Sequence, residues 1–212
     1  MQLLANTTSP FVRVARIAMI EKGIEVEPTV VDPWADDTRL RTANAASRVP
    51  TLVLDDGTAL TECMLIVQWL EVARPAPQWP HLLGKTPEQA AGVASRAGIA
   101  MGGIEASVHT VITRKVTAPV LFDETPVGLR RRRTMIECAQ RLEALAAAMG
   151  GANPGASAPT LDIVCAVVFH DYQEMRHADQ PWFPATPALK SLAHAMRQRP
   201  SIAGTVPYMP KA

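Results

Sequence analysis

The sequence is poor in cysteine. Only three of its 212 residues are cysteines, Cys63, Cys138 and Cys165, and they lie far apart along the chain. An odd number of widely spaced cysteines does not suit a disulfide framework or a zinc site. We therefore expect three reduced thiols.

The sequence also lacks an excess of charge and any long apolar run. Lys and Arg number 21 against 20 Asp and Glu, so the net charge is +1, which gives no general attraction to nucleic acid or membrane surfaces. Four consecutive arginines, Arg130 to Arg133, would spread around a helix rather than form one basic stripe. No apolar run reaches spanning length, and the N-terminus lacks a signal-peptide pattern. For these reasons we expect a cytoplasmic protein. The five histidines show no metal-site spacing, so we expect no bound metal.

The most informative stretch runs from Ser47 to Glu71 and has the pattern of a hairpin followed by a helix. An apolar β-prone run, Thr51 to Leu54, is followed by Asp55-Asp56-Gly57, which is a hairpin signal. The chain returns as a short strand over residues 58–60. Apolar residues at helical spacing then predict a helix that begins near Cys63.

Two features of this stretch suit an extended peptide ligand that carries a carboxylate. The Val49-Pro50 bond, which we expect to be cis, would present backbone groups just before the first strand. The helix that begins near Cys63 has free N–H groups in its first turn, and such a helix N-terminus binds anions. Together they predict a cradle in which a peptide lies along Val49 with its carboxylate at the helix start.

The residues before this stretch complete a recognisable order of elements. A strand over residues 1–5 precedes a helix that Ser9 caps, that Pro10 starts and that ends near Lys22 before Gly23. A second strand over residues 29–31 and a short helix follow. The resulting order, βαβα-ββα, is that of a thioredoxin-like α/β domain.

The chain changes character after residue 74. Three prolines, Pro75, Pro77 and Pro80, occur in a segment without periodicity, which is typical of a linker. Beyond it every signal is helical. We therefore predict a thioredoxin-like domain over residues 1–74, a linker over 75–85 and an all-α helical domain over 86–212.

Three segments together resemble cytosolic glutathione S-transferases. They are TTSPFVRVARIAMIEKGIEVE, SRVPTLVLDDGTALTECMLIVQWLE, and the Asp162-Ile163 helix with RPSIAGT near the end, so the resemblance covers nearly the whole chain. The SPFVR start is similar to the serine-using bacterial and tau-like members. The resemblance implies the glutathione S-transferase fold, a homodimer, and detoxification by conjugating glutathione to a small hydrophobic electrophile.

The resemblance also implies which residues act. Ser9 would hold the glutathione thiolate, with Thr8 and then Thr7 in reserve, although its hydroxyl could instead serve only as a helix cap. Tyr172 and Tyr208, the two tyrosines, lie far from this loop, so activation by tyrosine at the usual position is excluded. No cysteine replaces Ser9, which favours conjugation over thiol exchange. The implied glutathione-binding residues are Ser9, Phe11, Arg48, Val49, Pro50, Glu62 and Cys63.

Three of these residues have alternative interpretations. Arg48 would lie beside the glycine moiety, but it could be an ordinary surface arginine. Glu62 would meet the γ-glutamyl ammonium, but acids are common at helix starts for the dipole alone. Cys63 replaces the usual serine and is a poorer donor, so we expect weakened glutathione binding. It is either a small, partly buried residue or a reactive thiol at a helix N-terminus.

For the second substrate, the resemblance points to the first long helix of the helical domain. The implied pocket residues there are Met101, Ile104, Val108 and His109. Two rivals to conjugation stay open. One is a glutathione-dependent isomerase, peroxidase or dehalogenase on the same scaffold. The other is a non-catalytic binding module, as in regulators that resemble stringent starvation proteins and in translation-factor domains.

Overall fold

The chain divides into two compact units in the computed structural model, which describes residues 1–119, 121–149 and 157–208. The first unit contains Met1–Leu82 together with the segment from Arg199 on, and the second contains Leu83–Gln198. The final segment therefore differs from the predicted division, which put it in the helical domain. The reason is polar pairing within the first unit: the carboxylate of Glu21 accepts hydrogen bonds from Arg199 Nε and Nη2 at 2.9 and 2.8 Å and from Ser201 Oγ at 2.5 Å.

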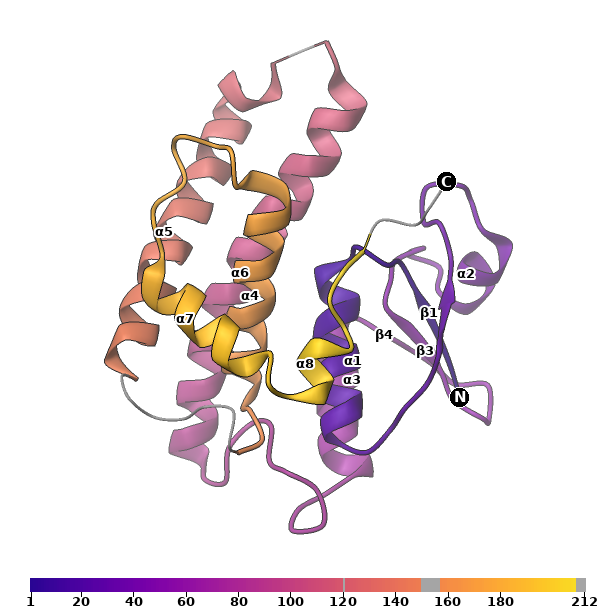
Figure 1. The fold of residues 1–212 in the computed structure, drawn as a ribbon. Coiled ribbons are helices and arrows are strands. Elements are labelled where there is room, and N and C mark those ends of the chain that lie inside the picture. Colours follow the sequence, from indigo (N-terminus) through magenta and orange to yellow (C-terminus); the bar gives the residue numbers. More distant parts are fainter. Residues whose placement is uncertain (120, 150–156, 209–212) are drawn as a thin grey trace. The chain divides into compact units, whose positions relative to one another are not determined.

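The first unit is built on a four-stranded mixed sheet with strand order β2-β1-β3-β4. Figure 1 shows α1 and α3 on one face of this sheet and α2 on the other. This arrangement confirms the predicted thioredoxin-like fold. In chain order its elements are β1 (Gln2–Ala5), α1 (Pro10–Glu21), β2 (Pro28–Val30), α2 (Thr38–Ala43), β3 (Thr51–Val53), β4 (Ala59–Thr61), α3 (Cys63–Ala73) and the short α8 (Pro200–Ala203).

Helix α1 begins and ends where the sequence predicts. Ser9 is its N-cap and Pro10 its first residue. The helix ends at Glu21 with Lys22 as its C-cap, and the next residue, Gly23, has a φ of 68°, a left-handed conformation that favours glycine. A Cβ atom there would lie 2.1 Å from Cζ3 of Trp79, so no larger residue fits. The apolar side of α1, including Val14 and Ile17, is fully buried.

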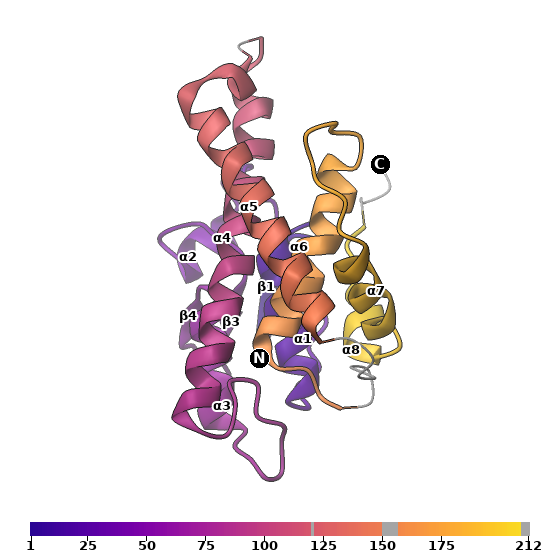
Figure 2. The same cartoon turned by 90° about the vertical axis from the view of Figure 1, so that its left-hand side faces the viewer.

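The second unit is helical, as predicted. Helix α4 packs against both α5 and α6, and α7 packs against α5 and α6. The two long helices α4 and α5 run side by side in both Figure 1 and Figure 2. The bounds are α4 (Pro87–Thr117), the 3₁₀ turn η1 (Phe122–Glu124), α5 (Pro126–Ala148), α6 (Leu161–His177) and α7 (Pro187–Met196). Across the described ranges, no helix has both the length and the apolar character of a membrane span.

Helix α6 is the buried centre of this unit, as its apolar sequence predicts. Its first turn contains the buried Asp162, whose Oδ2 accepts from Arg96 Nε at 2.6 Å and whose Oδ1 accepts from Thr160 Oγ1 at 2.5 Å. The hydroxyl of the N-cap residue Thr160 thus bonds the acid rather than a backbone N–H of the helix, and an arginine of α4 supplies the counter-charge. A buried carboxylate needs such partners because burial without them is costly.

Candidate functional site

The strand register brings three loops of the first unit to one edge of the sheet. Leu4 of β1 lies opposite Thr51 of the antiparallel β3, and Thr51 lies opposite Thr61 of β4. The carboxyl end of β1, the start of β3 and the carboxyl end of β4 are therefore neighbours. As a result, the loop before α1, the Val49-Pro50 turn and the start of α3 all leave the sheet from this edge.

In the first loop, the two candidate hydroxyls have different partners. The backbone N–H and the hydroxyl of Thr8 both donate to Asn6 Oδ1, at 3.0 and 2.9 Å, so the Thr8 proton is already used. Ser9 Oγ accepts from the backbone N–H of Val12 at 3.3 Å, which is the helix cap. Among the described residues, none accepts the Ser9 hydroxyl proton. Ser9 can therefore cap α1 with a lone pair and still donate to an anion.

The second loop contains the Val49-Pro50 peptide bond, which is cis, as predicted. The backbone that leads into this bond is fixed by a buried side-chain amide that local sequence patterns did not indicate. Asn44 Nδ2 donates to the carbonyl of Arg48 and to Thr51 Oγ1, both at 3.0 Å, and Thr51 Oγ1 donates to the same carbonyl at 2.8 Å. These bonds hold the turn on both sides of Pro50. An asparagine after a short helix is too common a pattern to have revealed this role.

The third loop ends at Glu62, the N-cap of α3. Its φ is 65°, an unusual left-handed conformation for a residue other than glycine. Its carbonyl accepts from the N–H groups of Leu65 and Ile66, each at 3.0 Å. The N–H groups that come before Leu65 in the helix therefore have no carbonyl of the helix to bond. Arg48 Nη1 lies 3.4 Å from Glu62 Oε1, and both side chains are exposed. Such an exposed pair contributes little stability, so both groups can reach a ligand.

Cys63 follows Glu62 but its side chain turns inward. It is 2% exposed, and burial together with the Glu62 carboxylate raises the pKa of its thiol to about 12. A thiol with this pKa stays protonated at neutral pH. The position therefore favours the interpretation of Cys63 as a small packing residue over that of a reactive thiol. Within the described residues none of the three cysteines forms a disulfide, and their spacing predicts reduced thiols.

Comparison with known proteins identifies the family. Residues 8–73 match the model of the glutathione S-transferase N-terminal domain. The chain is 28% identical, over 100% of both sequences, to the uncharacterized GST-like protein YibF of Escherichia coli strain K12. Its structure matches that of a glutathione S-transferase from Methylobacterium radiotolerans, crystallised with glutathione sulfonate, at a TM-score of 0.85 and 27% identity, covering 100% and 96% of the two chains. Residues 8–73 therefore belong to the glutathione S-transferase N-terminal domain family.

Further members show how widely the likeness extends. A probable glutathione S-transferase of Oryza sativa subsp. indica, GSTU1, is 37% identical over 81 residues, which is 38% of this chain and 34% of the rice protein. A glutathione S-transferase from Methylobacillus flagellatus shares the fold, with a TM-score of 0.82 at 22% identity over 98% and 99% of the chains. The stretch that matches the family model, residues 8–73, lies within the first unit.

The residues predicted to line a second-substrate pocket have unequal exposure in α4. Ile104 is fully buried, Met101 and Val108 are half-buried, and His109 is exposed, 3.7 Å from Glu105 of the same helix. Their assignment to a pocket stays a prediction, as do the glutathione contacts of Phe11, which is half-buried on α1.

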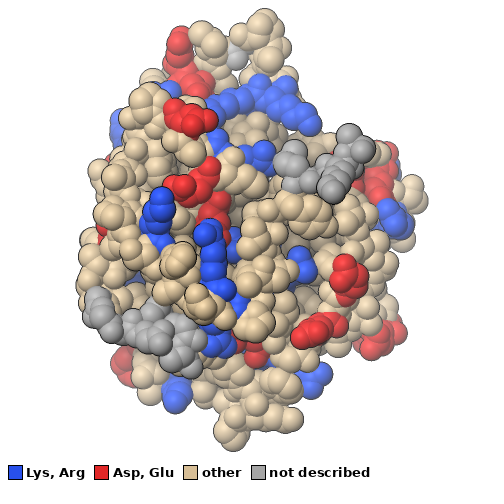
Figure 3. Space-filling view, viewed as in Figure 1, with Lys and Arg blue, Asp and Glu red and all other residues tan. Residues whose placement is uncertain are grey.

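The surface shown in Figure 3 carries basic and acidic side chains interspersed on a largely uncharged face. This mixture agrees with the net charge of +1. Within residues 1–119, 121–149 and 157–208, no group of three or more His, Cys, Asp or Glu side chains is arranged to hold a metal ion.

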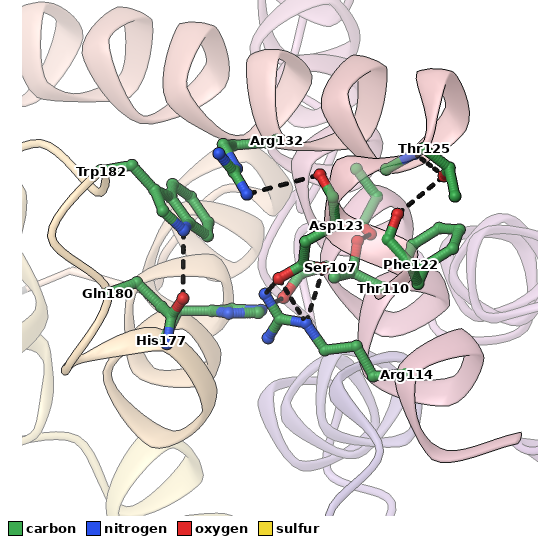
Figure 4. Close-up of polar contacts among 12 residues, drawn as sticks. Ser107, Thr110, Arg114, Phe122, Asp123, Thr125, Arg132, His177, Gln180 and Trp182 are labelled. Atoms are coloured by element: carbon green, nitrogen blue, oxygen red, sulfur yellow. Dashed lines mark hydrogen bonds and ion pairs between the residues drawn. The ribbon is translucent and has the colours of Figure 1, made fainter. Parts of the chain in front are cut away.

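The helical unit also contains a polar cluster, shown in Figure 4. His177 Nε2 lies 2.9 Å from Ser107 Oγ, and the His177 ring packs against Trp182 with centroids 5.7 Å apart. Nearby, Arg114 forms a bidentate pair with Asp123 at 2.5 to 3.0 Å. No described residue hydrogen-bonds His177 Nδ1. Burial, reinforced by Arg114, lowers the pKa of His177 to about 4, so the ring is neutral at pH 7.

Proposed function

We propose that this chain binds glutathione along the edge formed by the three loops and transfers its thiolate to a small hydrophobic electrophile. The observation that carries the proposal is the contrast between two hydroxyls. Thr8 spends its proton on Asn6, whereas Ser9 accepts from Val12 and keeps its proton for a ligand. The glutathione sulfonate in the complex of the 27% identical relative supports the choice of ligand.

The dimensions of the edge suit glutathione. Two interstrand steps separate the end of β1 from the end of β4, which is roughly 10 Å. An extended tripeptide has about the same length. In this proposal the cysteinyl backbone pairs with Val49, and the γ-glutamyl carboxylate lies at the first N–H groups of α3. Its ammonium lies near Glu62, and Arg48 meets the glycine carboxylate.

In this proposal, Ser9 stabilises the thiolate of glutathione. A helix N-terminus favours a nearby anion by up to about 2 kcal/mol, and a hydrogen bond to a charged group is worth about 1.5–3 kcal/mol. Each pKa unit corresponds to about 1.36 kcal/mol, so together they lower a thiol pKa of about 8.5 by a unit or two. The sulfur then attacks the electrophilic carbon, the leaving group departs with its electron pair, and the thiol proton passes to solvent.

The proposal is tested by replacing each hydroxyl separately. Ser9→Ala should lower kcat for a generic aryl halide by about tenfold or more, since losing a donor to an anion typically costs about 10²–10³. It should raise the apparent pKa of the pH–rate profile while costing only about 1 kcal/mol of stability as a lost cap. Thr8→Ala is the matched control and should change kcat little. Full activity of Ser9→Ala with loss in Thr8→Ala would overturn the assignment.

Calorimetric titration with glutathione separates the rival functions. Binding with turnover of an aryl halide supports conjugation, whereas turnover of only peroxide, isomerisable or alkyl-halide substrates supports a peroxidase, isomerase or dehalogenase. Binding without any turnover supports a regulatory module. Absence of glutathione binding would refute the proposal altogether.

We further propose a cytoplasmic homodimer with a detoxifying role. Leu65 and Val72 are 55% and 80% exposed on α3. They are seven residues apart and so lie on one face of the helix, which supports a contact between copies. The mass in sedimentation equilibrium decides between monomer and dimer.

A further inference from the structure

A cavity of about 340 Å³ lies entirely within the first unit and extends along one face of α1. Four residues of α1 line it, Ser9, Val12, Arg13 and Arg16, which follow the i, i+3, i+4, i+7 spacing of a single helix face. Its other walls are the β1 loop, β2 and the segment 203–208. A volume near the lower end of the range for ligand pockets suits a small molecule.

Polar, charged and apolar residues all line the cavity. Val12, Pro28, Val30 and Val206 supply apolar walls. Arg16 lies at the boundary with a second cavity of about 360 Å³ and lines both. This mixed lining suits a small polar ligand that has some apolar surface and a charged group that reaches Arg16.

Arg16 differs from the other charged groups of the cavity. It is half-buried, and it makes no hydrogen bond or ion pair within the described part of the chain. Arg13 is buried and donates from Nη2 to the carbonyl of Ile202 at 3.5 Å. Glu27 is exposed and lines both cavities, but it forms no ion pair with Arg16 in the described ranges. A partly dehydrated guanidinium without a partner favours an anion, best of all a planar carboxylate.

We propose that this cavity binds the carboxylate end of the second substrate, with Arg16 as the residue that selects for it. The inference rests on the proposed transfer of the thiolate at Ser9. Arg16 lies two turns after Ser9, roughly 10 Å along the helix axis, and its side chain leans back toward the helix N-terminus. A single-ring arene can bridge this span with its reactive carbon toward Ser9 and its carboxylate toward Arg16.

The test uses 4-chloro-3,5-dinitrobenzoate and its methyl ester as paired electrophiles. In both, the glutathione sulfur bonds to the ring carbon, the carbon–chlorine bond breaks and chloride leaves. Arg16→Gln should raise KM for the acid by about tenfold or more and change KM for the ester by less than about twofold. Arg16→Lys keeps the charge and should show a smaller loss. Arg41→Gln, at an exposed arginine of α2 paired with Asp36, should affect neither substrate.

Binding without chemistry separates this inference from the proposed function. Calorimetry with 3,5-dinitrobenzoate, which has no leaving group, should show binding to the wild type that Arg16→Gln weakens about tenfold. Glu27→Gln should strengthen it or leave it unchanged, because a repelling carboxylate is removed; weaker binding would overturn the anion assignment. Selective acid binding without turnover of either electrophile would reject conjugation and keep the site. Turnover of both with equal KM, unchanged in Arg16→Gln, would reject the site and keep conjugation.

Discussion

The buried His177 makes the stability of the protein depend on pH in a calculable way. Its pKa is about 4 in the folded protein because burial and the nearby guanidinium groups of Arg114 and Arg176 disfavour the imidazolium. Asp123 opposes this effect, but its charge is already neutralised by the bidentate pair with Arg114. Protonating the ring would also place an N–H at Nδ1, which no described residue accepts. In the unfolded chain the pKa returns to about 6.5.

The sign follows from which state binds the proton more readily. Between pH 6.5 and pH 4 the unfolded chain takes up a proton that the folded protein does not, so stability falls as the pH falls. The loss reaches about 2 kcal/mol at pH 5 relative to pH 8, and approaches roughly 3 kcal/mol near pH 4. Burial also lowers the pKa of His170, so this second ring contributes in the same direction.

The assay is urea unfolding at pH 5 to 8 of the wild type and of His177→Gln, whose amide can still bond Ser107 Oγ. His170 titrates in both proteins, so the difference between their pH slopes isolates His177. We expect the variant to be less stable than the wild type at pH 8 but to lose about 2 kcal/mol less on going to pH 5. Equal slopes in the two proteins would refute the reasoning, as would an imidazole resonance of His177 that titrates near pH 6.5.

Two further predictions concern the first unit. Lys22 is fully buried and pairs with Glu71 at 2.8 Å, and Glu71 also accepts from the Leu82 N–H at 2.9 Å. Lys22→Met should therefore cost about 3–5 kcal/mol in urea unfolding, because it leaves a largely buried carboxylate without its cation; a loss below about 1 kcal/mol would contradict this. Leu65→Glu should halve the mass found in sedimentation equilibrium by placing like charges across the proposed contact. A dimer that survives the change would move the contact elsewhere.

Local sequence signals were sufficient for most of the first unit. Ser9 with Pro10 marks the start of α1, and Gly23 marks its end, because cap and turn residues act on their own backbone. The Val49-Pro50 bond was predictable for the same reason. Each of these features depends on residues only a few positions apart, which is the distance over which sequence patterns are most informative.

What escaped prediction depends on partners far apart in the chain. The two bonds of Asn44 Nδ2 fix the turn before β3 only once the chain has doubled back after α2. The inward position of Cys63 depends on packing, since a residue at a helix start can face either the ligand or the core. No local pattern singles out Arg16, which lines a cavity only because residues 203–208 supply another wall.

The pairing of Glu21 with Arg199 and Ser201 has a consequence for synthesis of the protein. The side chain of Glu21 is only 6% exposed, so its carboxylate depends on these partners, which are 178 and 180 residues later in the chain. These two partners are synthesised only after the whole helical unit has been translated. The first unit is thus the first to be translated and the last to be completed, because the helical unit is inserted between its two parts in the sequence.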